Sequence, residues 1–348
     1  MAMWTLRLMA LVVMAVPAVA QQPATEQPAK PWRLPRMADG HPDLQGNWTN
    51  ATQTPLTRPG GQERALTKEQ VERVEKIRAD TIDRLSRPSD PNRTAPPKGG
   101  DGSVGAAGMV GGYNYFYIDA GDHVMVVNGE YRSSIIVDPS NGRPPPLTQQ
   151  ARDRLGARGK TLGGFGPYDN PENRPLAERC ILSFGSNAGP PMLPNYFYNN
   201  NYTIVQTKDH VMIMTEMVHD ARIIPLKQVP RLPEQVHPWM GDSQGRWEGD
   251  TLVIETTNFH PNQDFGAASP NRKVIERLHR VDEKAILYRF TIDDPATFTQ
   301  PWSGELPFLK MDEMIYEYAC HEGNYALSNV LSGARSAERE AAAAKPKQ

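Results

Sequence analysis

The chain has 348 residues, with 38 Lys and Arg against 40 Asp and Glu, and a formal net charge of −2 at pH 7. That balance gives no electrostatic reason to expect binding to nucleic acid or to an anionic membrane. Hydrophobic residues make up 39% of the sequence, which is ordinary for a folded domain, whereas 32 Pro and 28 Gly indicate many loops around the core.

The first twenty residues have the pattern of a secretory signal peptide. Arg7 precedes an apolar run over residues 8–16, and Ala18-Val19-Ala20 matches a cleavage site. The apolar run is too short to span a bilayer. We therefore predict a signal peptide over residues 1–20, a flexible Pro-rich lead-in over residues 21–40, and an exported protein that is periplasmic or extracellular.

The two cysteines, Cys180 and Cys320, are the only ones in the chain. In an exported protein such a pair favours a disulfide. The bond would close a loop of about 140 residues and, in the chain-entropy model, add up to about 4–5 kcal/mol of stability. The alternative is a pair of buried thiols that never meet. We expect the disulfide.

The β-rich part of the chain is predicted to begin near residue 41 and to form a single domain over residues 41–335. Its first strand signal is the alternation of Leu44, Gly46 and Trp48. Turn residues then lead into an insertion over about residues 62–112, which interrupts the β pattern.

This insertion contains the one convincing helix signal. Apolar residues recur at helical intervals over residues 66–85, and Thr67 with Gln70 has the spacing of a capping box. The Gly-rich run over residues 99–112 lacks the Lys-Ser/Thr of a P-loop, so we do not expect it to bind phosphate.

After the insertion, strand-length blocks alternate with turn residues. The blocks lie at residues 113–119, 123–129, 131–139, 203–226, 237–259, 274–281, 285–292 and 314–320. We expect a turn around residues 242–245 and a loop that holds Pro301 and Trp302. This spacing predicts a mainly β fold, an antiparallel meander that closes into a barrel or sandwich, with long Pro/Gly loops. Residues 336–348 are expected to be a disordered tail.

Several phrases resemble a widespread family of exported bacterial proteins. They are PDLQGNW, MVHDARIIPL, GDSQGRWEGDTLVIETTNF and IYEYACHEGNY, at residues 42–48, 217–226, 241–259 and 315–325. The resemblance covers most of the chain after the signal peptide and implies export and one shared architecture, but no particular activity. The Gly-x-Trp at residues 46–48 also resembles the opening of lipocalins, in which the Trp plugs the closed end of a barrel. That second resemblance implies a lipocalin-like fold.

Several of the strand-like blocks carry a carboxylate among apolar neighbours. Strict alternation puts Glu216, Asp220 and Arg222 on one face of their block. Glu255, Glu276 and Glu317 take similar positions in later blocks. Buried carboxylates are costly unless paired, so their repetition indicates ion pairs or a polar site. If the faces converge in a barrel, closely spaced acids supply acid/base chemistry near neutral pH. The alternative is that they lie on the solvent face of a sheet.

The candidate site therefore has two sets of residues. The candidate catalytic residues are Glu216, Asp220, Glu255, Glu276 and His321. The candidates for binding a substrate combine charge, aromatic rings and amide groups, and they are Arg222, His219, Trp239, Asn200, Tyr202 and Glu317. His219 and Asp220 are either a base with its orienting partner or a hydrogen-bonded strand end.

A run of soft donors lies between His210 and His219 and includes three methionines. Alternation puts Met217 and His219 opposite Met212 and Met214, so we interpret the methionines as gap-filling core residues. The acidic turns at residues 241–245 and 248–250 lack the regular ligand spacing of a calcium loop. We expect no metal and no cofactor.

The sequence thus predicts an exported β protein that binds a small molecule. Acid/base catalysis in a carboxylate-lined cavity is the leading hypothesis, with hydrolase, lyase or isomerase chemistry. The alternatives are a non-catalytic carrier of a small lipophilic or sugar-like ligand, and a structural or interaction protein of the cell envelope. No nucleic-acid partner and no membrane span are expected.

Overall fold

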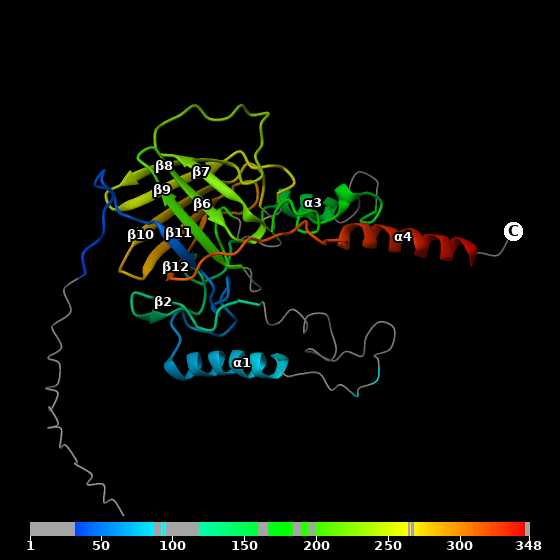
Figure 1. The fold of residues 1–348 in the computed structure, drawn as a ribbon, viewed down its shortest axis with the longest axis horizontal. Helices are drawn as coiled ribbons and strands as arrows, with labels where there is room; N and C mark the ends of the chain where they lie inside the picture. The colour runs from blue at the N-terminus through cyan, green and yellow to red at the C-terminus, as the bar shows by residue number, and fades with distance from the viewer. Residues whose placement is uncertain are drawn as a thin grey trace, which may run out of the picture. The chain divides into compact units, whose positions relative to one another are not determined.

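Alternating apolar residues build one large antiparallel sheet of ten strands (Figure 1). The strand order is β7-β6-β5-β1-β12-β11-β10-β9-β8, and β4 pairs with β12 beside this path. The strands are β1 (Gly46–Thr49), β4 (Ile136–Asp138), β5 (Asn201–Gln206), β6 (His210–Thr215), β7 (Ala221–Pro225), β8 (Asp242–Glu248), β9 (Thr251–Thr257), β10 (Lys273–Arg280), β11 (Ala285–Asp293) and β12 (Trp302–Met311). The prediction of a mainly β, antiparallel fold is confirmed.

This computed structural model describes residues 32–86, 92, 94, 118–158, 166–183, 189–194, 199–263, 265 and 268–344. The predicted signal peptide, most of the lead-in, the Gly-rich run and nearly all of the block at residues 113–119 lie outside these residues. The chain divides into two units, Met1–Arg33 and Leu34–Gln348, and every element named here belongs to the second.

Among the described residues, two helices interrupt the strands in sequence, one between β1 and β4 and one between β4 and β5, and a third follows β12. They are α1 (Lys68–Ser86), α3 (Gln149–Arg158) and α4 (Ala326–Ala343), and a small second sheet pairs β2 (Val126–Val127) with β3 (Glu130–Tyr131). The predicted capping box is present: the Thr67 amide donates to Gln70 Oε1 (2.8 Å), and the Gln70 amide donates to Thr67 Oγ1 (3.3 Å). Residues 336–343, which we expected to be disordered, continue α4.

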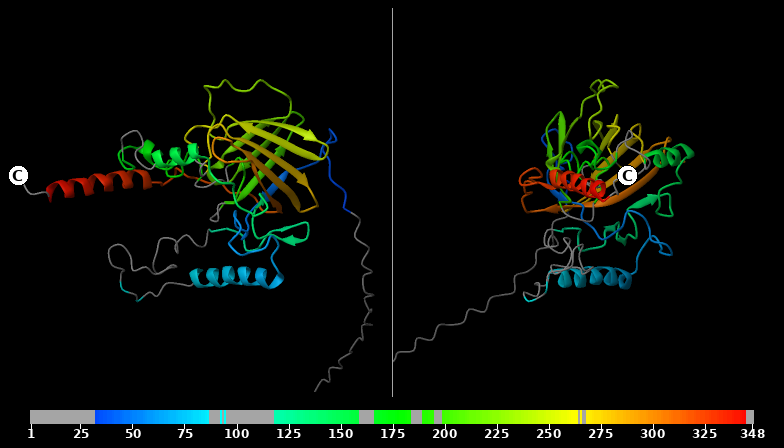
Figure 2. Two further views of the ribbon diagram at one scale, coloured as in Figure 1. Left: turned by 180° about the vertical axis from the view of Figure 1, so that it is seen from behind. Right: turned by 90° about the vertical axis from the view of Figure 1, so that its right-hand side faces the viewer.

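The sheet is curved (Figure 2). The core residues lie on its inner face. Trp48 is fully buried, and its indole Nε1 donates to the Leu44 carbonyl at 3.0 Å. The guanidinium of Arg280 lies 5.5 Å from the centre of the Trp48 ring and donates to the Asp43 carbonyl. Trp48 therefore lies near the point where β10 turns into β11, and it fills that end of the sheet.

The sheet does not close into a barrel within the described residues. Every pairing along the path from β7 to β8 is antiparallel, and the path has nine strands, so its two edge strands run in the same direction. Closure would need a parallel ladder between them. Instead the edges meet through side chains: a Cβ on Gly245 would lie 3.0 Å from Leu226 and 3.1 Å from Ile224.

Two strand predictions near the C-terminus were wrong. Residues 314–320 form no strand, and the stretch expected to be a loop contains the longest strand, β12. The loop was predicted around Pro301 and Trp302, but β12 begins at Trp302 and also accommodates Pro307. On the side of β12 away from β11, β4 reaches only Ser303 and Gly304 and β1 only Leu309 to Met311, so Pro307 faces no partner strand there.

The turn predicted at residues 242–245 was wrong, because those residues belong to β8. The turn predicted at residues 248–250 is present, and Gly249 in it has a φ of +58°. Gly245 pairs with Ile254 of β9, and glycine suits this strand position because the side chains of Ile224 and Leu226 leave little room for a Cβ.

Candidate functional site

A tight turn between β6 and β7 breaks the alternation on which the sequence prediction relied. The Thr215 amide donates to the Asp220 carbonyl at 2.8 Å, which closes the turn. Val218 and His219 both have left-handed backbones, with φ of +62° and +49°. A β-branched residue rarely adopts this conformation, and such strain costs about 1–3 kcal/mol and is concentrated at functional sites.

His219 and Asp220 lie side by side at the end of this turn. The Nδ1 of His219 is 3.0 Å from the Tyr318 carbonyl, and because a carbonyl only accepts, Nδ1 is the donor and Nε2 is the nitrogen left to exchange a proton. Burial raises the pKa of Asp220 to about 6, although nearby His219 lowers it. The buried Oδ2 of Asp220 has no hydrogen-bond partner among the described residues.

Glu216 begins the turn and lies beneath residues 315–320, which we call the strap. Its carboxylate accepts from Asn201 Nδ2 at 2.7 Å and from the Tyr316 amide at 3.2 Å. Glu216 is 4% exposed, whereas the Tyr316 side chain is 82% exposed. The strap therefore covers Glu216 with backbone and contributes little packing of its own.

A disulfide anchors the strap. Cys180 and Cys320 are joined with an S–S distance of 2.08 Å, as predicted from the sequence. Because Cys320 directly follows the backbone that contacts Glu216 and His219, the disulfide fixes the cover of the turn.

A second polar group lies inside the sheet. Arg222 donates to Glu276 twice, at 2.6 and 3.0 Å, and the Tyr288 hydroxyl donates to the same carboxylate at 2.8 Å. Glu276 is fully buried. Burial opposes the charge on Arg222, but Glu276 outweighs it and raises the pKa of Arg222. Burial, reinforced by Glu276, also raises the pKa of Tyr288, so this phenol remains a donor.

This interior group continues toward a covering loop. The Met192 amide donates to the Tyr288 hydroxyl at 2.9 Å, and Asn50 Nδ2 lies 3.2 Å from both the Met192 carbonyl and the Tyr202 hydroxyl. Burial raises the pKa of Tyr202, so it too stays protonated. Arg222 of β7 and Glu276 of β10 are thus joined directly, with Tyr288 as a further donor to Glu276, and the pair links the two strands across the interior.

The remaining predicted site residues lie apart from these two groups. Glu255 lies on the outer face of β9 and pairs with Arg231 at 3.2 Å, while Glu317 and His321 are exposed. Asn200 is buried and donates to the Asp119 carbonyl at 2.9 Å. The structure therefore does not bring Glu216, Glu255, Glu276 and Glu317 together. Register explains part of this: Glu255 lies opposite Ile275, whereas Glu276 lies opposite Ile254.

Trp239 stacks on His260, with the ring centres 3.8 Å apart. The Asn262 amide donates to His260 Nδ1 at 3.1 Å, so Nε2 carries the proton in the neutral ring. Burial, and secondarily the charge of His237, lowers the pKa of His260, which favours that neutral form. The pair is an aromatic surface without a net charge.

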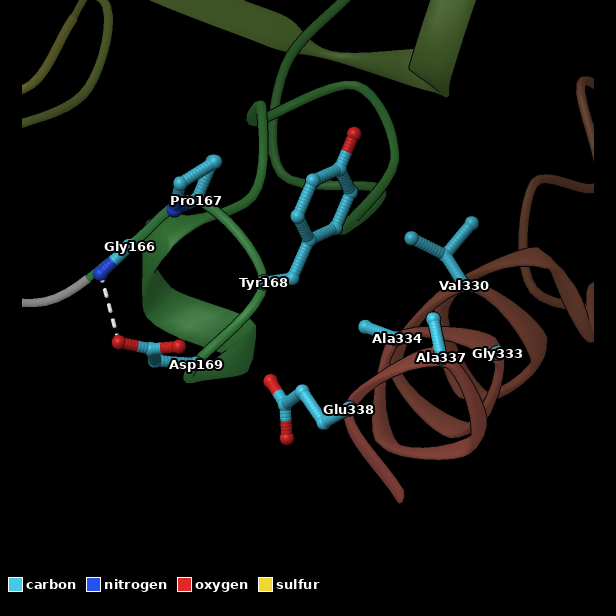
Figure 3. Close-up of a pocket in the computed structure, with 9 residues that line it drawn as sticks. All are labelled: Gly166, Pro167, Tyr168, Asp169, Val330, Gly333, Ala334, Ala337 and Glu338. Carbon is cyan, nitrogen blue, oxygen red and sulfur yellow. Dashed lines mark hydrogen bonds between the residues drawn. The ribbon is translucent and has the colours of Figure 1, made fainter. Parts of the chain in front are cut away.

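An open hollow lies between residues 166–169 and α4 (Figure 3). Tyr168 faces Val330, Ala334 and Ala337 across it, so its lining is mostly apolar. Its Asp169 is already engaged, since it accepts from the Gly166 amide at 2.6 Å and lies 3.6 Å from Arg335. None of the predicted site residues lines this hollow, and it offers no acid/base pair.

Sequence reasoning missed Tyr288 and Asn50. Tyr288 alternates with Ile286 and Phe290 on the inner face, and Asn50 lies two residues beyond Trp48. Alternation therefore contained a usable signal for both, because a polar group on an apolar face needs a buried partner.

In the described part of the chain, no group of three His, Cys, Asp or Glu side chains is arranged to hold a metal ion, and no helix is long and apolar enough to cross a membrane. Comparison with models of known families, with curated proteins and with solved structures finds no match to this chain.

Proposed function

We propose that this protein binds a small neutral molecule beside the turn at residues 216–220 and exchanges protons with it. The observation that carries the proposal is the Asp220 carboxyl, whose buried Oδ2 is without a hydrogen-bond partner in the described chain and sits next to a strained backbone. A carboxyl left unpaired in such a place is a cost to the fold, which a role in binding or catalysis explains.

The chemistry assigned to the two residues follows from their protonation. Asp220, with its pKa raised to about 6, serves as the acid, and His219 accepts a proton on Nε2. An adjacent acid and base fit hydrolysis, elimination or isomerisation of a neutral substrate. Glu216, held by Asn201 and the strap, positions the turn rather than reacting.

We also propose that the protein is exported, belongs to the family that its sequence resembles, and has a lipocalin-like fold. The disulfide supports export, and the phrases quoted above support membership of the family of exported bacterial proteins. The burial of Trp48 under Arg280 supports a lipocalin-like cup with one filled end.

A substrate panel tests the catalytic role. Wild-type protein, Asp220→Asn and His219→Gln are assayed against nitrophenyl esters, nitrophenyl glycosides and small epoxides, with Asp312→Asn as the control because Asp312 is exposed. We expect turnover that falls as the pH rises through about 6, is lost in the first two variants and persists in the third. Equal turnover in Asp220→Asn contradicts the role of Asp220, and ligand binding without turnover favours the non-catalytic carrier.

A further inference from the structure

The outer face of β6 carries three soft donor side chains. Val211, Ile213 and Thr215 are buried on the inner face of this strand. Because successive side chains alternate, His210, Met212 and Met214 lie together on the other face. The two methionines are half-buried and His210 is exposed. They are not core residues, which corrects the interpretation made from the sequence. Of the three methionines between His210 and His219, only Met217 is fully buried.

The surroundings of the two methionines are uncharged. Register places Met212 between Val205 of β5 and Ile223 of β7, which are 40% and 70% exposed. Met214 lies between Thr203 and Ala221 in the same way. The outer face of an antiparallel sheet is ordinarily polar. Two thioethers in an exposed, uncharged row therefore call for a reason other than core packing.

The donor set selects one class of ligand. Thioethers and imidazole prefer soft cations such as Cu(I), whereas Ca²⁺ and Mg²⁺ need oxygen donors, which these side chains lack. Alternate residues on a strand are about 7 Å apart, and methionine has three rotatable bonds, so the donors at positions 210 and 214 can reach an ion above position 212.

His210 is available for such a role. Its backbone bonds to Thr207, but its ring forms no hydrogen bond within the described residues. Both cysteines of the chain are in the disulfide, so no thiol competes for a soft cation. We propose that His210, Met212 and Met214 bind one soft monovalent cation, Cu(I) or its redox-inert analogue Ag(I).

Titration of the full mature chain with Ag(I) tests this site. Calorimetry in chloride-free buffer gives the stoichiometry, and NMR of the methionine methyl groups locates the ion. Competition with a chromophoric chelator under ascorbate then gives the affinity for Cu(I). We expect one ion per chain and shifts of the Met212 and Met214 methyl signals, while the buried Met217 is unaffected.

Variants separate this site from adventitious binding. The double variant Met212→Leu with Met214→Leu should bind the ion at least about tenfold more weakly. Losing a residue that only supports a metal ligand already weakens metal binding by about tenfold or more, and this variant removes two ligands themselves. His210→Gln should also weaken it, whereas Met314→Leu, at an 80% exposed methionine, should not. Leucine keeps the volume of methionine, so unchanged circular dichroism is expected.

Three outcomes would overturn the proposal. They are no binding of Ag(I) or Cu(I) by the wild type, binding that the double leucine variant retains, and methyl shifts confined to other methionines. If the double variant does not fold, the wild-type methyl shifts and the single variants still decide the question.

Discussion

The buried ion pair between Arg222 and Glu276 makes the sharpest prediction about stability. Replacing Arg222 with Met leaves a carboxylate at zero exposure with only the Tyr288 hydroxyl as a donor. Breaking one side of a buried pair costs about 3–5 kcal/mol, because the other charge remains uncompensated. We therefore expect Arg222→Met and Glu276→Gln each to lower the free energy of unfolding by about that amount.

The double variant distinguishes the pair from two independent residues. In Arg222→Met with Glu276→Gln no buried charge remains, and Gln can still accept from Tyr288. The loss should then be well below the sum of the single losses. Urea unfolding followed by tryptophan fluorescence, in oxidising buffer, measures each free energy and checks that the slope is unchanged.

A matched control uses an ion pair of the same residue types on the outer face. Arg277 also lies on β10 and is 2.8 Å from Glu248, but its side chain is 44% exposed. Arg277→Met should change stability little, since solvent screens such pairs. Single losses below about 1 kcal/mol, or full additivity in the double variant, would refute the argument that this pair braces the interior.

Three further perturbations have defined outcomes. Folding raises the pKa of Asp220 from 3.8 to about 6, so the stability that protonated Asp220 contributes is complete below pH 3.8 and lost as the pH rises through 6. The melting temperature of Asp220→Asn should therefore exceed that of the wild type above pH 6 and match it below pH 4. A difference that does not change with pH would contradict this. Gly304→Ala should cost about 1–3 kcal/mol in urea unfolding, because its Cβ would overlap the Phe290 ring; a neutral effect would mean that the ring moves freely. Cys180→Ala with Cys320→Ala should lose up to about 4–5 kcal/mol and speed hydrogen exchange at the strap, and slow exchange there would show that the disulfide is not its anchor.

The sequence was sufficient where a signal is local. The capping box at Thr67 and Gln70 needs only residues three apart, and the pairing of Cys180 with Cys320 follows from there being no other cysteine. The alternation in β10 and β11 was visible for the same reason, because each strand is long and uninterrupted.

The candidate site was harder to predict because it depends on a break in the pattern. Strict alternation carried through residues 216–220 placed Glu216 beside Arg222, but the turn puts Glu216 under the strap and Arg222 in the interior. Nothing in the local pattern marks Val218 as left-handed, since a β-branched residue is among the least expected there. The prediction that Glu216, Glu255, Glu276 and Glu317 converge was wrong for this reason, and because residues 314–320 form no strand.

The meeting of β7 and β8 has a consequence for how the protein behaves in solution. An unpaired edge strand is a template on which another chain can add, and this sheet has two. Here each edge faces the other, and the connection between them also shields β8: Gln244 donates to the Val229 carbonyl at 2.6 Å, and Arg231 donates to the Asp242 carbonyl at 2.8 Å. Pro230 and Pro233 in this connection have no amide proton to offer a new strand. Loosening the contact between β7 and β8 would expose both edge strands at once. Variants that weaken this contact should therefore aggregate before they unfold completely.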